Sequence, residues 1–550
     1  MGGANAGSED AFIIKMNVST GILDTNFGNG DGQDFDGIVQ INNSNASSAN
    51  GNDEVSSIAL DGTGFLYVGG QTDSTLGGIG AGGDDAFILK MNASTGILDT
   101  SFGNGDGVDN DGIVQINDSN ANSANGDEII NSIALDGAGF LYAGGSTFSS
   151  LGGTNAGGED AFILKMNAIT GVLDTSFGNG DGVDNDGIVQ INDSNANSAS
   201  SNDEINSIAL DGTGALYAGG QTRSSLGGTN PGVGFSNDGF IFKMDTSTGV
   251  LDTNFGDGDG IDDDGIVQIN DSNTNSASGY DQILSIALDG LGFLYAGGST
   301  QSSLGGTYAG NQDGFILKMA VSTGILDTSF GDGDGVDSDG IIQINDSNTN
   351  SASSVDWIIS ITLDGLGSLY VGGVTRSSLG GTNGGGTDAY VLKMDASTGI
   401  LDTSFGDGDG IDGDGIVQIN NSNANATGGF DSIRSIALDG AGILYVGGKT
   451  ENSLGGPKAG YDDAFIFKMD AGSGALDTSF GNGDGIDNDG ILQINNSNTN
   501  SAEGREVINS IATDGDYLYV GGWTSSSLGG VRAGSRDIFT IVIPVGAGGL

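Results

Sequence analysis

One unit of 75 residues is repeated seven times along this chain, and that repetition limits what the chain can fold into. The segment Leu-Asp-Thr-Ser/Asn-Phe-Gly recurs at a spacing of 75 residues, with one spacing of 78. Its aspartates are Asp24, Asp99, Asp174, Asp252, Asp327, Asp402 and Asp477. A second segment, Leu-Tyr-Val/Ala-Gly-Gly, gives the same count with Tyr67, Tyr142, Tyr217, Tyr295, Tyr370, Tyr445 and Tyr519. A fixed period of this length predicts a repeat architecture in which each copy packs against its neighbours.

The composition restricts the partners of such an array. The 550 residues contain 72 acidic and 15 basic side chains, a formal charge of −57, which disfavours nucleic acid and anionic membranes and favours cations. Cysteine and histidine are both absent, so disulfides, thiol or imidazole catalysis and the usual zinc ligands are excluded. Because the period is unbroken, we expect residues 1–550 to form one assembly of seven modules.

No apolar run approaches the 18 residues that a membrane-spanning helix needs, so we expect no membrane span. The first residues contain neither a basic head nor an apolar core, so no signal peptide is recognised in them.

Within a repeat, short apolar runs are separated by glycine-rich turns, which indicates β-strands. In the second copy the pattern predicts strands over 130–135, 140–145, 161–166 and 188–191. Four antiparallel strands in each of seven units predict an all-β fold, a seven-bladed β-propeller. A β-solenoid is the alternative, although its coils usually hold fewer residues than 75.

The same stretches resemble two bacterial repeat families. Leu-Tyr-Val-Gly-Gly-x-Thr followed by Asp-Ala-Phe-Ile-Leu-Lys-Met resembles the SBBP β-propeller repeat. Gly-x-Leu-Asp-Thr-Ser-Phe-Gly followed by Gly-Ile-Val-Gln resembles the delta-60 repeat. The resemblance covers essentially the whole chain and implies extracellular or cell-surface propellers, without catalytic residues to carry over. The run Gly-Asp-Gly-x-Asp-x-Asp-Gly departs from the usual short delta-60 loop.

That acidic run precedes each fourth strand and presents three or four carboxylates within eight residues. Ca²⁺ takes six to eight oxygen ligands, and glycine lets such a loop wrap around the ion. Acidic positions 1, 3, 6 and 8 do not match an EF-hand, and Mg²⁺ prefers a tighter shell. Aspartate and asparagine also favour plain turns, but four neighbouring carboxylates repel one another unless neutralised. We predict about one Ca²⁺ per repeat. The predicted ligands are Asn29, Asp31, Asp34 and Asp36; Asn104, Asp106, Asp109 and Asp111; Asn179, Asp181, Asp184 and Asp186; Asp257, Asp259, Asp262 and Asp264; Asp332, Asp334, Asp337 and Asp339; Asp407, Asp409, Asp412 and Asp414; and Asn482, Asp484, Asp487 and Asp489.

One lysine recurs in every third strand. The series is Lys15, Lys90, Lys165, Lys243, Lys318, Lys393 and Lys468. We expect each lysine to pair with a nearby aspartate and to pack its stem on the sheet. A cationic ring for an anionic ligand is the alternative. The repeated phenylalanines and tyrosines are expected in the core rather than on a carbohydrate platform.

The strand count leaves one strand over. Third strands begin at Asp10, Asp85, Asp160, Asp238, Asp313, Asp388, Asp463 and Asp537, one more than the seven units need. We expect the N- and C-terminal segments to share a blade, which leaves either residues 11–16 or the segment 537–550 without a place. A surplus strand that adds to a neighbouring molecule would generate filaments. A locally tucked terminus is the alternative.

These observations predict a non-enzymatic, calcium-stabilised extracellular structural protein, a surface scaffold or fibre subunit that self-associates. The alternative is a calcium-dependent adhesin or glycan-binding propeller. The repeats favour the scaffold because no aromatic cluster or basic patch is evident that would break their symmetry.

Overall fold

The computed structural model describes most of the chain, with gaps in the loops. The described residues are 7–28, 37–41, 51–73, 75–78, 83–104, 106, 110–117, 126–153, 155, 158–179, 185–191, 202–226, 237–256, 264–269, 279–306, 308, 311–331, 338–344, 355–381, 383, 385–406, 413–419, 429–481, 489–494 and 504–525. They form 28 strands, and the described part of the chain contains no helix that is long and apolar enough to cross a membrane.

The strands take four recurring places. The inner strands are β3 (Gly51–Leu60), β7 (Glu128–Leu135), β11 (Asp203–Leu210), β15 (Gln282–Leu288), β19 (Asp356–Leu363), β23 (Gly429–Leu438) and β27 (Glu506–Thr513). The second strands are β4 (Phe65–Thr72), β8 (Phe140–Thr147), β12 (Ala215–Thr222), β16 (Phe293–Thr300), β20 (Ser368–Thr375), β24 (Ile443–Thr450) and β28 (Tyr517–Thr524).

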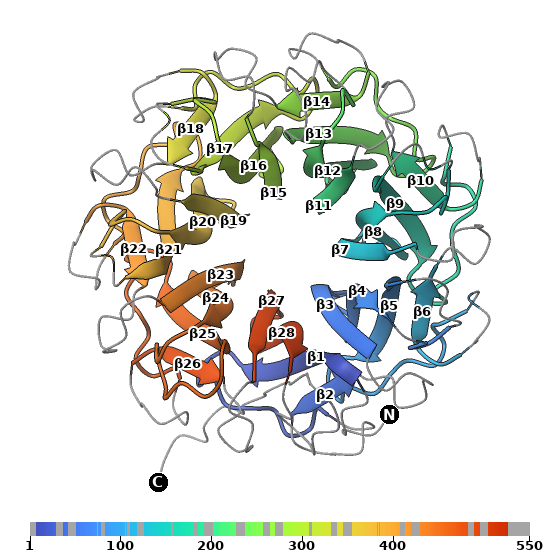
Figure 1. Ribbon diagram of the computed structural model, residues 1–550, viewed down its shortest axis with the longest axis horizontal. Helices are drawn as coiled ribbons and strands as arrows, with labels where there is room; N and C mark the ends of the chain where they lie inside the picture. The colour runs from blue at the N-terminus through green and yellow to red at the C-terminus, as the bar shows by residue number, and fades with distance from the viewer. Residues whose placement is uncertain are drawn as a thin grey trace.

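The third strands are β1 (Gly7–Asn17), β5 (Asp85–Asn92), β9 (Asp160–Asn167), β13 (Asp238–Asp245), β17 (Asp313–Ala320), β21 (Gly386–Asp395) and β25 (Asp463–Asp470). The outer strands are β2 (Ile38–Ile41), β6 (Ile113–Ile116), β10 (Ile188–Ile191), β14 (Ile266–Ile269), β18 (Ile341–Ile344), β22 (Ile416–Ile419) and β26 (Ile491–Ile494). Inner, second, third and outer strands pair antiparallel in that order, as in β11-β12-β13-β14. The result is an all-β, propeller-like fold of four-stranded antiparallel units arranged around a ring (Figure 1).

The chain ends meet in one of these units. Strand β1, close to the N-terminus, pairs antiparallel with β28, and β2 pairs with the other edge of β1. N- and C-terminal segments therefore share one sheet, with order β27-β28-β1-β2. Because β1 fills the third place there, residues 11–16 have a position in the array. The segment 537–550 lies outside the described residues.

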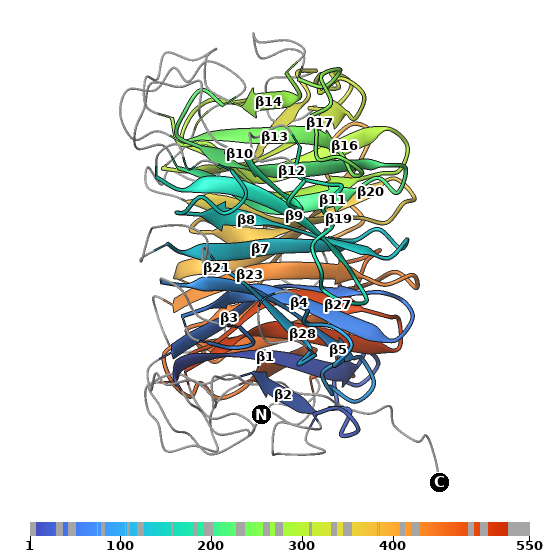
Figure 2. The same ribbon diagram turned by 90° about the vertical axis from the view of Figure 1, so that its right-hand side faces the viewer.

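Hydrogen bonds connect each inner strand to the next around the ring. A serine hydroxyl on one inner strand accepts the backbone N–H of an isoleucine on the following one, at 3.1–3.2 Å. The donor and acceptor pairs are Ile133 and Ser57, Ile208 and Ser132, Ile286 and Ser207, Ile361 and Ser285, Ile436 and Ser360, Ile511 and Ser435, and Ile58 and Ser510. The series returns from β27 to β3, and Figure 2 shows the strands running across the thickness of the disc.

The apolar core lies between neighbouring units. Ile88 and Val114 of one unit pack with Ile130, Phe162 and Leu164 of the next in a single buried cluster. Alternation of side chains along the strands explains this, because buried side chains then lie on both faces of each sheet.

Candidate functional site

The structure describes part of each predicted calcium loop except the first. Nine of the predicted ligands are described, namely Asn104, Asp106, Asp111, Asn179, Asp186, Asp264, Asp339, Asp414 and Asp489. Outside the described residues lie Asn29, Asp31, Asp34, Asp36, Asp109, Asp181, Asp184, Asp257, Asp259, Asp262, Asp332, Asp334, Asp337, Asp407, Asp409, Asp412, Asn482, Asp484 and Asp487.

The last aspartate of each described loop accepts a hydrogen bond from the first residue of the outer strand. Oδ1 of Asp111 accepts the N–H of Ile113 at 2.9 Å, and the same bond recurs in the five following copies at 2.9–3.0 Å. Asp106 folds back on the same strand, where its Oδ2 accepts the N–H of Gln115 at 2.8 Å. Hydrogen bonds of this kind, from a nearby backbone N–H to the side chain, are typical of aspartate in turns. The described residues contain no group of three or more acidic side chains placed to hold a metal ion, so calcium stays a prediction.

Acidic loops of successive repeats meet at one pocket. A cavity of about 630 Å³ lies between two successive repeats and is lined by Asn104 and Asp106 of one loop and by Asp186 of the next. The amide of Asn104 donates to the carbonyl of Thr170 across this junction at 3.1 Å. The loop residues thus connect neighbouring units as well as capping their own strand.

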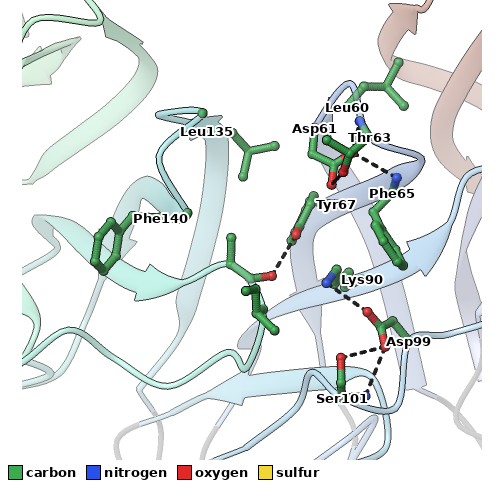
Figure 3. A pocket seen from close by; sticks show the side chains of 14 residues that line it. Leu60, Asp61, Thr63, Phe65, Tyr67, Lys90, Asp99, Ser101, Leu135 and Phe140 are labelled. Carbon is green, nitrogen blue, oxygen red and sulfur yellow. Dashed lines mark hydrogen bonds and ion pairs between the residues drawn. The ribbon is translucent and has the colours of Figure 1, made fainter.

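The predicted lysine pairs are confirmed. In every third strand the lysine Nζ lies 2.7–2.8 Å from an aspartate Oδ2 nine residues later. Figure 3 shows Lys90 and Asp99 in a pocket of about 530 Å³ that also contains Phe65, whose ring centroid lies 4.2 Å from the lysine Nζ. Burial alone would raise the pKa of Asp99, but hydrogen bonds from Lys90 and Ser101 outweigh it and lower the pKa. Because the Lys90 side chain is 5% exposed, this lysine does not belong to a cationic ring on the surface.

The repeated tyrosines are core residues, as predicted. Tyr67 is buried, its hydroxyl donates to the carbonyl of Ala168 in the next unit at 2.7 Å, and its ring meets Phe102 edge-on. A buried tyrosine whose hydroxyl is bonded in this way stabilises packing and leaves no open aromatic face.

The repeats differ from one another at one end of their strands. Where inner strands begin and second strands end, the repeats carry unlike side chains, and we call this end of the ring the inner rim. Paired across the two strands are Glu54 with Gln71, Ile129 with Ser146, Glu204 with Gln221, Gln282 with Ser299, Trp357 with Val374, Ser432 with Lys449, and Val507 with Trp523. Both tryptophans of the chain lie here. The residues that follow the second strands are Asp73, Phe148, Arg223, Gln301, Arg376, Glu451 and Ser525.

The rim side chains form local polar networks that differ from unit to unit. In the third unit, Asn237 accepts from Arg223 Nε at 2.9 Å and donates to Gln221 at 2.7 Å. Trp357 Nε1 donates to Gln312 at 2.7 Å. Several rim side chains stay open to solvent, including Phe148 at 42% and Tyr461 at 51% exposure.

The charged groups of the rim also differ from unit to unit. Asp462 has two cations, Lys449 at 3.6 Å and Arg505 at 3.8 Å. In the unit of β3 to β6, burial together with the charges of Asp127 and Asp73 raises the pKa of Asp84 to about 6.

A comparison of the seven repeats, column by column, would have found the rim from the sequence. The framework columns are nearly constant, whereas the columns of Glu54 and Gln71 each hold several chemical types. The strand register was needed to show that these columns are neighbours in space.

No family model matches the chain, and no curated protein matches it. Among solved structures, it is similar to the extracellular domain of a one-component system from B. thetaiotaomicron, with 14% identity and a TM-score of 0.35. That match covers 86% of this chain but 38% of the other. A polysaccharide lyase of family PL25, an ulvan lyase, matches with 10% identity over 78% of this chain and 84% of that one, with a TM-score of 0.33. The hemagglutinin-neuraminidase ectodomain of parainfluenza virus 5 matches with 11% identity, 76% and 81% coverage and a TM-score of 0.28. At these values the comparisons identify neither a family nor an activity.

Proposed function

We propose that this chain is a seven-bladed, extracellular, non-enzymatic propeller that binds a surface glycan at its inner rim. The contrast between a repeated framework and a variable rim carries this proposal. Framework features such as the lysine pairs and the serine-to-isoleucine bonds recur in seven copies, which supports a ring of seven blades. Side chains that differ from repeat to repeat on one rim of a repeated framework can form a single recognition surface.

The rim chemistry suits a carbohydrate. Rings such as Trp357, which is half-buried, and Phe148, which is 42% exposed, offer flat apolar faces, and neighbouring amides and carboxylates offer directional hydrogen bonds to hydroxyl groups. The resemblance to SBBP and delta-60 repeats supports an extracellular location. We keep calcium in the proposal because acidic loops of successive repeats converge on a shared pocket, as Asp106 and Asp186 do.

A glycan array probed with the full chain tests the proposal. We expect retention of one glycan class, and we expect Trp357→Ala to weaken that binding about tenfold or more, a typical cost for a buried aromatic anchor. The matched control is Ile169→Ala, which removes an exposed apolar side chain at the opposite end of a third strand. No retained glycan, or equal loss from both variants, contradicts rim recognition, and cleavage of the bound glycan contradicts the non-enzymatic assignment.

A filament-forming scaffold is the second candidate, and one observation favours it. The unit that contains β27 and β28 is already completed by β1 and β2, although the sequence of segment 537–550 copies a third strand. Strand addition of this segment to another molecule would give a head-to-tail filament. Electron microscopy of the full chain should then show filaments that are lost when residues 537–550 are deleted. Filaments that survive the deletion contradict this assembly.

A further inference from the structure

Two carboxylic acids occupy neighbouring backbone positions wherever one four-stranded unit is followed by the next. One begins a third strand and the other begins the following inner strand. Parallel backbone bridges align them, because Thr387 pairs with Phe430 just before Asp388 and Asp431, and Asp462 pairs with Arg505 just before Asp463 and Glu506. The six acid pairs with described side chains are Asp85 with Glu128, Asp160 with Asp203, Asp238 with Asp281, Asp313 with Asp356, Asp388 with Asp431, and Asp463 with Glu506.

All twelve of these side chains are buried, each with an exposure of 2% or less. The third-strand acid accepts the amide of an outer-strand glutamine, as Asp463 Oδ2 does from Gln493 at 2.7 Å. The inner-strand acid accepts a threonine hydroxyl, as Asp431 Oδ1 does from Thr450 at 2.5 Å. Each junction therefore removes two carboxyl groups from water and gives one oxygen of each a hydrogen-bond donor.

The key observation is the second oxygen of two of these acids and of Asp53, which holds the matching inner-strand position on β3. Asp431 Oδ2, Asp463 Oδ1 and Asp53 Oδ2 are buried and have no hydrogen-bond partner among the described residues. A buried ionised oxygen without a partner is strongly disfavoured, so the junction needs either a proton or a cation there.

The surroundings of the acids distinguish these two possibilities. The groups around Asp431 are Asp388 on β21 and Thr450, Glu451 and Asn452 at the end of β24, and no described cation acts on it. Asp463 has Asp462 and Glu506 beside it, donors from Gln493 and Ala459, and one cation, Lys458. Asp53 has Thr72, Asp73 and Asp84. The neighbours that are not carboxylates mainly donate hydrogen bonds to these acids. A metal ion would need several more oxygen ligands.

We propose that each junction between units holds one proton shared by its two carboxyl groups, which makes the cohesion of the ring sensitive to pH. One acid of the pair is then neutral and donates to its ionised partner, and the glutamine and threonine donors stabilise the remaining charge. Removing the proton leaves two charges at a dry junction and weakens the contact between neighbouring units.

The titration behaviour agrees with this arrangement. Burial, with further contributions from Asp73 and Asp84, raises the pKa of Asp53 to about 8. Burial and the charge of Asp388 raise the pKa of Asp431 to about 7, and burial, with a smaller contribution from Asp462, raises that of Asp463 to about 7. Because these folded-state values exceed the unfolded value near 4, the stabilisation is complete below pH 4 and is lost as pH rises through 7 to 8.

Proton release on unfolding tests the proposal. The metal-free full chain is mixed with guanidinium chloride in unbuffered solution held at pH 6, and the released protons are titrated. We expect Asp431→Asn to lower the release by about one proton per chain, since the lone partner acid then ionises while folded. Asp463→Asn tests a second junction in the same way. The control is Asp211→Asn in an exposed turn, where burial would raise the pKa but hydrogen bonds from Thr213 and Ala215 lower it, so the release should not change.

Equal release from the parent chain and both junction variants overturns the shared proton. The same holds if the parent chain binds metal that Asp431→Asn loses, because the junction then holds a cation. If neither variant folds, infrared spectra of the parent chain decide the matter. A protonated carboxyl band should be present at pH 6 and should disappear as pH rises above 8, and its absence at pH 6 contradicts the proposal.

Discussion

At the scale of single residues, the seven lysine–aspartate pairs show how one repeated contact stabilises the whole ring. Lys165 and Asp174 lie 2.8 Å apart with side-chain exposures of 6% and 18%, and the lysine Nζ also lies 4.1 Å from the ring centroid of Phe140. Such a pair adds modest net stability over an apolar substitute, but removing one partner leaves an uncompensated charge.

We therefore expect Lys165→Met to lower the free energy of unfolding by about 2 kcal/mol, less than for a fully buried pair because Asp174 retains some contact with water. The double variant Lys165→Met with Asp174→Asn should recover part of the loss. Urea unfolding measures both. Additive effects of the two substitutions would contradict a coupled pair.

The same pair predicts a pH dependence. Burial opposes ionisation of Asp174, but hydrogen bonds from Lys165 and Ser176 lower its pKa below the unfolded value. Its contribution is therefore present above pH 4 and is lost as pH falls through the folded-state pKa. Urea unfolding of the parent chain at a series of pH values below 5 should show this loss, and the double variant should show less of it. Identical pH profiles would contradict this assignment.

At the scale of the strand, the glycine pair in each second strand lets neighbouring units approach. Gly144 faces Ile205 and Ile208 of the next inner strand, where an added Cβ would meet both side chains. A Cβ at Gly145 would collide with the carbonyl oxygen of Ile129. At this position the inner strand has a register shift between Ile130 and Ser132.

We expect Gly145→Ala to destabilise the chain by about 3 kcal/mol, because backbone rather than a flexible side chain must move. The matched control is Gly137→Ala in an exposed turn, where φ is 68° and no atom lies within 4 Å of the added Cβ. This control should cost about 1 kcal/mol through backbone strain alone. Thermal or urea unfolding compares the two, and equal losses would show that the close approach has no energetic role.

The strand bounds show which elements could be predicted from the sequence. The prediction for 188–191 coincides with β10, and those for 140–145 and 161–166 fall within β8 and β9. Short apolar runs between glycines define these elements locally. The buried acid pairs were missed because their two members belong to different repeats and meet only through the junction between units, as Asp388 and Asp431 do. The rim was missed because its variable positions become neighbours only through the strand register, as Glu54 and Gln71 do. Most predicted calcium ligands lie outside the described residues.

At the scale of the whole molecule, the formal charge of −57 opposes a compact ring, because like charges repel one another. The lysine pairs neutralise seven aspartates, and the proposed junction protons and calcium ions would neutralise more. The junction protons and the calcium ions can be removed separately, because protons are lost at high pH and calcium is lost to a chelator.

Removal of calcium should therefore lower the melting temperature at constant pH. Each occupied site contributes about 2.7 kcal/mol when free calcium is a hundredfold above Kd. Differential scanning calorimetry with EDTA and with added Ca²⁺ measures the shift, and Mg²⁺ at the same concentration is the control. An unchanged melting temperature, together with no calcium in elemental analysis, would contradict the calcium loops.

The central claim is that the repeated framework presents one variable recognition surface, the inner rim. Hydrogen exchange measured with and without a glycan retained on the array tests it most directly, because amides at a binding surface become protected. We predict protection in segments 202–204, 221–223 and 355–357, with no change in the opposite turns such as 136–140. Protection confined to those turns, or spread equally over all seven repeats, would contradict the claim.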